Sequence, residues 1–434
     1  MKRKIGAVAL ATAALVVLAG CSSTPETNAP DPDEAKGQNI TLWLMGGDTP
    51  AELRDYLKTE YNEATGGTLT IEEQGWGDAI AKLTTALPDA DNTPDVTEIG
   101  NTWSGTFTGV GAFSDITDMY EELGGDKLLK GFVDAGKVGD SNYALPYYFG
   151  SRYGFYRKDL FAAAGVDVPT TLPQLTEAAQ KLRTDATSGF YIGGEDWRNG
   201  ISWVFAYGGD LAKRDGDTWA SSLSDPKTIE GLTALQELYT TASNAPITEN
   251  DVTTYENLNT QPGADAPEAA ATMAPGWAHW SIGDLSQDPE DDSKLIPTWN
   301  DEVFGTFVLP GVDGGIAPVF AGGSNIAISK ASKNQAGARE LMKIIFSEEY
   351  QNMLGANGLG PANSDYVGSL GDDQFAKALV ESALGSKLTP AAPGWAAVEG
   401  SGLLEEFFSK VNGGGDIAAL AAEYDQKIDE LING

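Results

Sequence analysis

The chain of 434 residues alternates between strand-like and helix-like segments from residue 39 onward, and this alternation restricts its fold more than any other feature. Residues 39–45 alternate apolar and polar side chains as a strand does, and residues 49–62 then repeat apolar positions at helical spacing. Strand patterns at 69–71 and 96–99 enclose a helix pattern at 78–87. The sequence therefore predicts an α/β architecture with a predominantly parallel sheet.

The later part of the chain adds helices and turns. Thr171 precedes a helical pattern at 172–182 and is suited to cap it, and the Asp-Gly pair within 214–217 predicts a hairpin turn. Four further helices are predicted at 335–346, 374–384, 403–411 and 417–432. The roughly 395 residues after residue 38 exceed what one hydrophobic core ordinarily supports, so we expect two domains.

The first 21 residues contain the parts of an export signal in the correct order. Three basic residues at 2–4 precede an apolar run at 5–19, which is too short to span a bilayer as a permanent helix. Leu-Ala-Gly-Cys at 18–21 then resembles a bacterial lipobox. We expect residues 1–20 to be removed and Cys21 to be lipidated; an ordinary signal peptide with a chance cysteine is the alternative. Cys21 is the only cysteine, so the chain has no intramolecular disulfide and no other thiolate.

Residues 22–38 are rich in Ser, Thr, Pro, Asp and Glu, which predicts a disordered tether between the lipidated Cys21 and the folded body. Without the signal, 25 basic and 63 acidic residues give a net charge of −38. This charge excludes nucleic acid as an expected partner and disfavours docking on anionic lipid. The membrane affinity would therefore come from the acyl group, on the outer face of the cell membrane.

Motifs for catalysis, cofactors and metals are mostly lacking in the sequence. A single histidine, His279, leaves little room for Ser-His-Asp or Cys-His chemistry, and we expect it to be a packed or surface residue. No Walker A loop, HExxH or EF-hand pattern is present, so we expect no cofactor and no metal. A glycosidase needs only two carboxylates, however, and this enzyme class stays open.

Aromatic residues beside Gly, Pro or charged residues at loop positions are the most informative functional feature. An indole plane accepts the apolar C–H face of a sugar ring, while Asp, Asn and Arg bind its hydroxyls. Trp43 lies inside a strand pattern and is assigned to the core. The candidates at strand ends or beside Gly or Pro are Trp76, Trp103, Trp197, Trp277 and Trp395. Each is a core residue under the alternative interpretation.

Several segments, taken in order, resemble the family 1 extracellular solute-binding proteins. They include 41–43 (Thr-Leu-Trp), 94–96 (Pro-Asp-Val), 155–161 (Phe-Tyr-Arg-Lys-Asp-Leu-Phe), 276–277 (Gly-Trp) and 322–328 (Gly-Gly-Ser-Asn-Ile-Ala-Ile). Within this family, 74–76, 98–102, 208–217 and 393–399 are similar to chitobiose-binding lipoproteins. The chain departs from that group at 146–150 and in the charged segment 195–198.

The resemblance implies two α/β lobes joined by crossing strands, with a ligand cleft between them. Lobe one would comprise 39–147 and 311–350, and lobe two 151–306 and 351–434, with a second crossing at 307–310. The family's cleft positions fall on Asp48, Trp76, Asn101, Trp103, Tyr148, Arg152, Glu195, Asp196, Trp197, Trp277, Asn325 and Trp395. A structural pair or cap is the alternative for Asp48 and Arg152, and a turn is the alternative for Asn325.

The resemblance also implies the function and partners. A monomer would capture an oligosaccharide, with chitobiose as the leading candidate, and deliver it to the membrane permease subunits of an ABC importer. Two other classes stay open. A cell-surface glycoside hydrolase would shorten the sugar, and an adhesin or structural lipoprotein would bind no small molecule.

Overall fold

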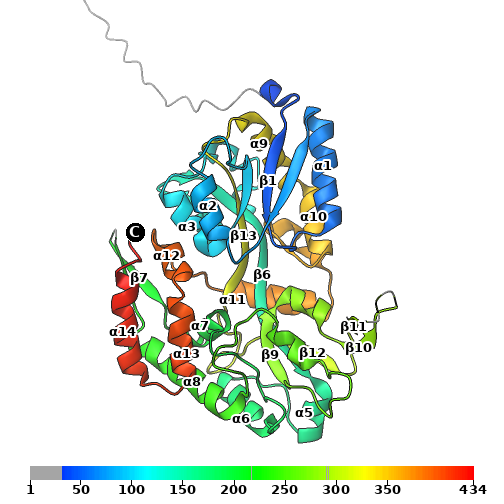
Figure 1. Cartoon of the computed structure of the whole chain (residues 1–434), viewed down its shortest axis with the longest axis vertical. Coiled ribbons are helices and arrows are strands. Elements are labelled where there is room, and N and C mark those ends of the chain that lie inside the picture. Colours follow the sequence, from blue (N-terminus) through cyan, green and yellow to red (C-terminus); the bar gives the residue numbers. More distant parts are fainter. Residues whose placement is uncertain (1–31, 217, 290, 292) are drawn as a thin grey trace, which may run out of the picture.

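The computed structural model describes residues 32–216, 218–289, 291 and 293–434. These residues form two lobes, one above the other in Figure 1, and the long strand β6 (Ala144–Arg157) runs from one lobe into the other. The predicted signal peptide, Cys21 and most of the predicted tether lie outside the described residues. Within the described part, no helix is long and apolar enough to cross a membrane.

Lobe one begins with alternating strands and helices, as the sequence predicts. Its elements are β1 (Ile40–Met45), α1 (Ala51–Thr65), β2 (Leu69–Gln74), α2 (Ala79–Ala86), β3 (Val96–Gly100), α3 (Asn101–Gly109), α4 (Lys130–Ala135), β4 (Lys137–Val138), β5 (Ser141–Asn142), β13 (Ala321–Ile328), α9 (Gln335–Ile345), α10 (Glu348–Ala356) and β14 (Gly360–Pro361).

Lobe two is built largely from helices. Its elements are α5 (Lys158–Ala164), α6 (Leu172–Leu182), α7 (Trp197–Ala206), β7 (Ala212–Asp215), β8 (Thr218–Ser221), α8 (Pro226–Ala242), β9 (Ala271–Pro275), the 3-10 helix η5 (Gly276–Ser281), β10 (Asp284–Gln287), β11 (Leu295–Thr298), β12 (Phe304–Phe307), α11 (Gln374–Gly385), α12 (Trp395–Gly400), α13 (Leu403–Asn412) and α14 (Ile417–Asp429). The 3-10 helix η6 (Ser364–Leu370) precedes α11.

Local sequence signals account for several helix ends. Thr171 caps α6, since its side-chain oxygen accepts a hydrogen bond from the Gln174 backbone N–H at 3.3 Å. Helix α6 has the predicted bounds 172–182. Helix α1 ends at Thr65, and the next residue, Gly66, takes the left-handed conformation with φ of 71° that glycine adopts without strain.

The main sheet is mixed and not predominantly parallel, which corrects the prediction. Strand β1 pairs in parallel with β2 and β3, but β13 is antiparallel to both β3 and β6. Strands β9, β12 and β14 also pair with β6 in antiparallel register. The alternation of strands and helices at the start of the chain predicts only the parallel part. The antiparallel pairs join segments that are far apart in the sequence.

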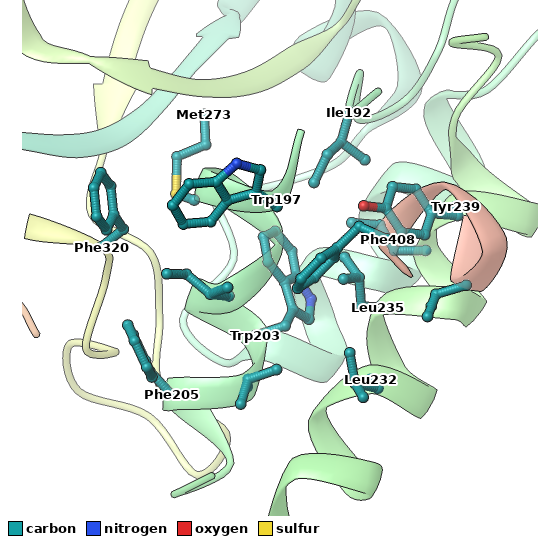
Figure 2. Close-up of a cluster of buried hydrophobic side chains, with 14 of the residues drawn as sticks. Ile192, Trp197, Trp203, Phe205, Leu232, Leu235, Tyr239, Met273, Phe320 and Phe408 are labelled. Atoms are coloured by element: carbon teal, nitrogen blue, oxygen red, sulfur yellow. The ribbon is translucent and has the colours of Figure 1, made fainter. Parts of the chain in front are cut away.

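Each lobe has its own apolar core. In lobe one, β1, α1, α9 and α10 contribute buried residues such as Leu42, Leu57 and Tyr350. The largest cluster belongs to lobe two, and Figure 2 shows part of it around Trp197, Trp203 and Phe408. The lobes also touch beside β6, where the backbone N–H of Ala396 in α12 donates to the Thr106 hydroxyl of α3 at 3.2 Å.

Three of the expected domain boundaries differ in the structure. Residues 33–38 are not a free tether, because Ala35 is buried and the Gln38 side chain accepts a hydrogen bond from the Gly337 backbone N–H at 2.8 Å. Leu309 and Val319 pack in the lobe-two core, so the return to lobe one comes at the start of β13 and not at 307–310. Tyr350 and Leu354 of α10 pack in lobe one, which therefore extends beyond residue 350.

Candidate functional site

A cavity of about 430 Å³ lies where β6 passes between the lobes. Residues 148–152 of β6 line it, together with segments that follow β1, β2 and β3 in lobe one and β9 in lobe two. Its volume falls within the ~300–1,000 Å³ that is usual for small-molecule sites. Because both lobes contribute walls, a ligand there would contact both.

The lobe-one wall is organised around the Asp48 carboxylate. Asp48 Oδ2 accepts two hydrogen bonds of 3.1 Å, one from Trp76 Nε1 and one from the Tyr148 hydroxyl. Trp76 packs edge-on against Trp103, with ring centroids 5.5 Å apart. Trp103 is buried, whereas Trp76 remains 36% exposed. The contacts fix the Trp76 plane while leaving part of its surface open to a ligand.

A second carboxyl group lies buried behind this wall. Glu98 on β3 accepts a hydrogen bond at 2.8 Å from the Met45 backbone N–H. Burial, followed by the negative charge of Asp48, raises the pKa of Glu98 to about 8. Burial also raises the pKa of Asp48, although the hydrogen bonds from Tyr148 and Trp76 oppose the shift. The negative charge of Asp48 therefore disfavours the ionisation of Glu98.

The lobe-two wall combines one exposed indole with a network of opposite charges. Trp277, in η5, is 42% exposed and lines the cavity. The guanidinium of Arg152 donates to Asp251 at 2.6 Å. Arg198 lies 3.5 Å from Asp251 and 3.1 Å from Glu399. The four charged residues form ion pairs with one another, so the wall is polar without carrying a large local charge.

Seven of the twelve predicted site residues line this cavity. They are Asp48, Trp76, Asn101, Trp103, Tyr148, Arg152 and Trp277. Asn101 is the first residue of α3, and its side-chain amide donates to the Ala321 carbonyl at 2.9 Å, which ties α3 to β13. The structure therefore brings together residues that are as much as 229 positions apart, from Asp48 to Trp277.

The structure places the other five away from the cavity wall. Trp197 and Trp395 are fully buried in the lobe-two core, and Figure 2 shows Trp197 between Met273 and Ile192. Asn325 is buried in β13, where its amide donates to the Phe132 carbonyl at 2.8 Å.

The two acidic members of this group have local structural contacts. The backbone N–H of Glu195, a half-buried turn residue, donates to the Glu249 carbonyl at 2.9 Å. Asp196 caps α7 by accepting from the Asn199 backbone at 3.0 Å, and it also accepts from the Asn199 side chain at 2.6 Å. Asn199 in turn accepts from Arg152 at 3.0 Å. Asp196 therefore supports a cavity residue from behind.

Sequence reasoning did not select Arg198, Asp251 and Glu399. Arg198 and Glu399 fall within the quoted segments 195–198 and 393–399, where charge beside tryptophan was the available signal. Asp251 lies in a loop with no neighbouring aromatic residue, and its partner Arg152 is 99 positions away. Only the folded arrangement identifies it.

Two α/β lobes around a shared, partly aromatic cavity define a two-lobe solute-binding protein. The model of the bacterial extracellular solute-binding protein family matches residues 46–352, and the chain belongs to that family. It is 30% identical over 409 residues to the diacetylchitobiose binding protein DasA of Streptomyces coelicolor, a match that covers 92% of this chain and 91% of the relative.

Solved structures agree on the fold. The sugar-binding protein MalE from Xanthomonas citri superposes with a TM-score of 0.72 at 21% identity and covers 91% of this chain and 97% of its own. The GacH receptor of Streptomyces glaucescens GLA.O gives a TM-score of 0.73 at 19% identity, with coverage of 92% and 98%. The predicted family and two-lobe fold are confirmed.

Proposed function

We propose that this protein binds an oligosaccharide in the interlobe cavity and delivers it to the permease subunits of an ABC importer. The observation that carries the proposal is the pair of part-exposed indoles, Trp76 from lobe one and Trp277 from lobe two, that line one cavity. Sugar rings have apolar faces that stack on indoles. Asp48 and Asn101 supply groups for the hydroxyls at the same wall.

Diacetylchitobiose is the leading candidate ligand. The similarity to DasA supports it, since this relative is named for that sugar and the match spans nearly the whole of both chains. An acetamido group has one N–H donor and one carbonyl acceptor. The lobe-one carboxylate and the lobe-two guanidinium groups of the cavity have the complementary chemistry.

Calorimetric titration tests the ligand. We expect the wild type to bind diacetylchitobiose more tightly than maltose or cellobiose, and Trp277→Ala to weaken binding by about tenfold or more, as for a buried aromatic contact. Trp43→Ala is the matched control, because Trp43 lies on β1 outside the cavity lining and donates to Glu72 at 2.8 Å. Absence of binding to every oligosaccharide in a broad panel would reject the proposal.

We further propose that Cys21 is lipidated and holds the protein, as a monomer, on the outer face of the cell membrane. The short apolar run that ends in the lipobox-like residues 18–21 supports this anchor. Cys21→Ser should release the protein into the medium or leave an unprocessed precursor. A processed Cys21→Ser protein that stays membrane-bound would contradict the anchor.

We also expect the protein to leave its ligand intact, since the family and the named relatives are binding proteins. The sugar should be recovered unchanged after long incubation with concentrated protein. Shortened products formed by an activity that co-purifies through several columns would instead favour the glycoside hydrolase.

A further inference from the structure

A third exposed indole lies next to the cavity but does not line it. Trp280 is 67% exposed and follows Trp277 by three residues in the 3-10 helix η5. A single exposed tryptophan on a protein surface is not in itself a site. The position and the support of this ring, however, connect it to the cavity.

The register of η5 places Trp277 and Trp280 on one face. A 3-10 helix has three residues per turn, so side chains at positions i and i+3 lie above one another. The exposure agrees, because Ala278 between them is buried and His279 is half-buried. With a rise of about 2 Å per residue, the two indoles start about 6 Å apart along the helix, on the order of one sugar ring.

His279, Phe375 and Trp299 form a ladder of aromatic rings that supports one face of Trp280. The centroids of Trp280 and His279 are 4.2 Å apart, and His279 stacks on Phe375 at 4.3 Å. Phe375 in turn contacts Trp299 at 4.7 Å. His279 is also fixed by the Gly276 carbonyl, 2.6 Å from its Nδ1. One face of Trp280 is thus held in place, and the ring needs little ordering to bind a ligand.

Helix α11, like η5, extends from the cavity to this ladder of rings. Leu379 lines the cavity, and its Cδ1 lies 3.6 Å from the position that a Cβ on Gly276 would occupy. One turn earlier on α11, Phe375 stacks on His279. Two neighbouring elements, η5 and α11, therefore connect the cavity wall to the rings that contact Trp280.

We propose that Trp280 forms an outer subsite, which stacks one further sugar unit of an oligosaccharide whose inner units occupy the cavity. This inference rests on the proposed function. The occupant is a saccharide chain and not a protein, because the exposed ring continues in register from an indole that lines the ligand cavity. The protein would then prefer chains longer than the cavity alone can enclose.

Titrations with the di-, tri- and tetrasaccharides of N-acetylglucosamine test the subsite. We expect Trp280→Ala to weaken the binding of the longer chains by about tenfold and to leave the disaccharide unchanged. Trp280→Phe should retain most of the preference for longer chains. Leu384→Ala is the control. Leu384 is an 84% exposed residue of α11, the helix that contains Phe375, and its replacement should alter none of these affinities.

Three outcomes would overturn the outer subsite. Equal affinities of the wild type and Trp280→Ala for the tetrasaccharide would show that the Trp280 ring does not bind sugar. An equal loss for all chain lengths would make Trp280 a support of the inner cavity. Impaired transport with unchanged sugar binding would assign the ring to a protein contact. If the wild type binds none of the three sugars, the proposed chitobiose function fails as well, which distinguishes this failure from the others.

Discussion

Replacement of Trp395 by alanine separates a core tryptophan from a ligand-binding one. Trp395 was a candidate sugar platform from its sequence, but its side chain is fully buried in the lobe-two core. Truncation of a fully buried aromatic residue costs about 3–5 kcal/mol, because apolar area is lost and a cavity remains. Natural domains have only about 5–15 kcal/mol of stability, so the loss is large.

Calorimetry measures the effect directly. For a cooperative unit of lobe size, each kcal/mol lowers Tm by about 2–4 °C, so Trp395→Ala should lower Tm by roughly 6–20 °C. Trp277→Ala is the matched comparison. It removes a 42% exposed ring whose contacts include Tyr255 at 5.5 Å, and it should lower Tm by only a few degrees while it weakens sugar binding.

The reasoning would be refuted by one pattern of results. If Trp395→Ala melts within a few degrees of the wild type and yet fails to bind sugar, the ring contacts the ligand and is not a core residue. Circular dichroism at the titration temperature shows which protein is folded. Affinity is then compared only between folded samples, so that lost stability is not mistaken for lost binding.

Three further predictions concern the carboxyl groups. The pKa of Glu98 is about 8 in the folded chain and about 4.5 in the unfolded chain. Between these pH values the folded chain binds a proton that the unfolded chain has released, so the free energy of unfolding should fall as the pH rises. Glu98→Gln should flatten this fall and stabilise the protein at pH 8 by at most about 5 kcal/mol in urea titrations. Sugar affinity should decrease as the pH falls through the raised pKa of Asp48, because protonation removes an acceptor, and Asp48→Asn should lose this pH dependence. Asp196→Ala should lower stability by about 1–2 kcal/mol through the lost cap of α7, and an unchanged urea midpoint would contradict that role.

Local patterns predicted many elements because the signals that form them are local. Helix α6 illustrates this, since Thr171 and the apolar spacing after it determine where the helix begins. Helix α3 was missed because its sequence, Asn-Thr-Trp-Ser-Gly-Thr-Phe-Thr-Gly, is rich in residues with low helix propensity. Tertiary contacts, including the Asn101 bond to the Ala321 carbonyl, stabilise it instead.

The candidate site shows why local sequence could not select its tryptophans. Pro-Gly-Trp-Ala occurs twice, at 275–278 and at 393–396, and the two indoles have opposite environments. Trp277 follows β9 at the cavity and stays exposed. Trp395 begins α12, where the Gly394 backbone N–H donates to the Ile432 carbonyl at 2.9 Å and the end of the chain packs against the turn. The difference comes from residues 37 positions away, which no local window includes.

The charged wall of lobe two also depends on contacts between distant segments, and its ion pairs restrict how the wall can interact with a ligand. Arg152, Arg198, Asp251 and Glu399 converge from separate segments, and their ion pairs at 2.6–3.5 Å exist only after lobe two has folded. Removal of one member would leave a buried charge without its partner, which costs more than the intact pair contributes. The wall therefore serves to hold donors and acceptors in fixed positions, and a ligand that matches them avoids the cost of reorganising it. Discrimination among sugars would then reside in this wall and in Asp48, while the indoles accept any ring with an apolar face.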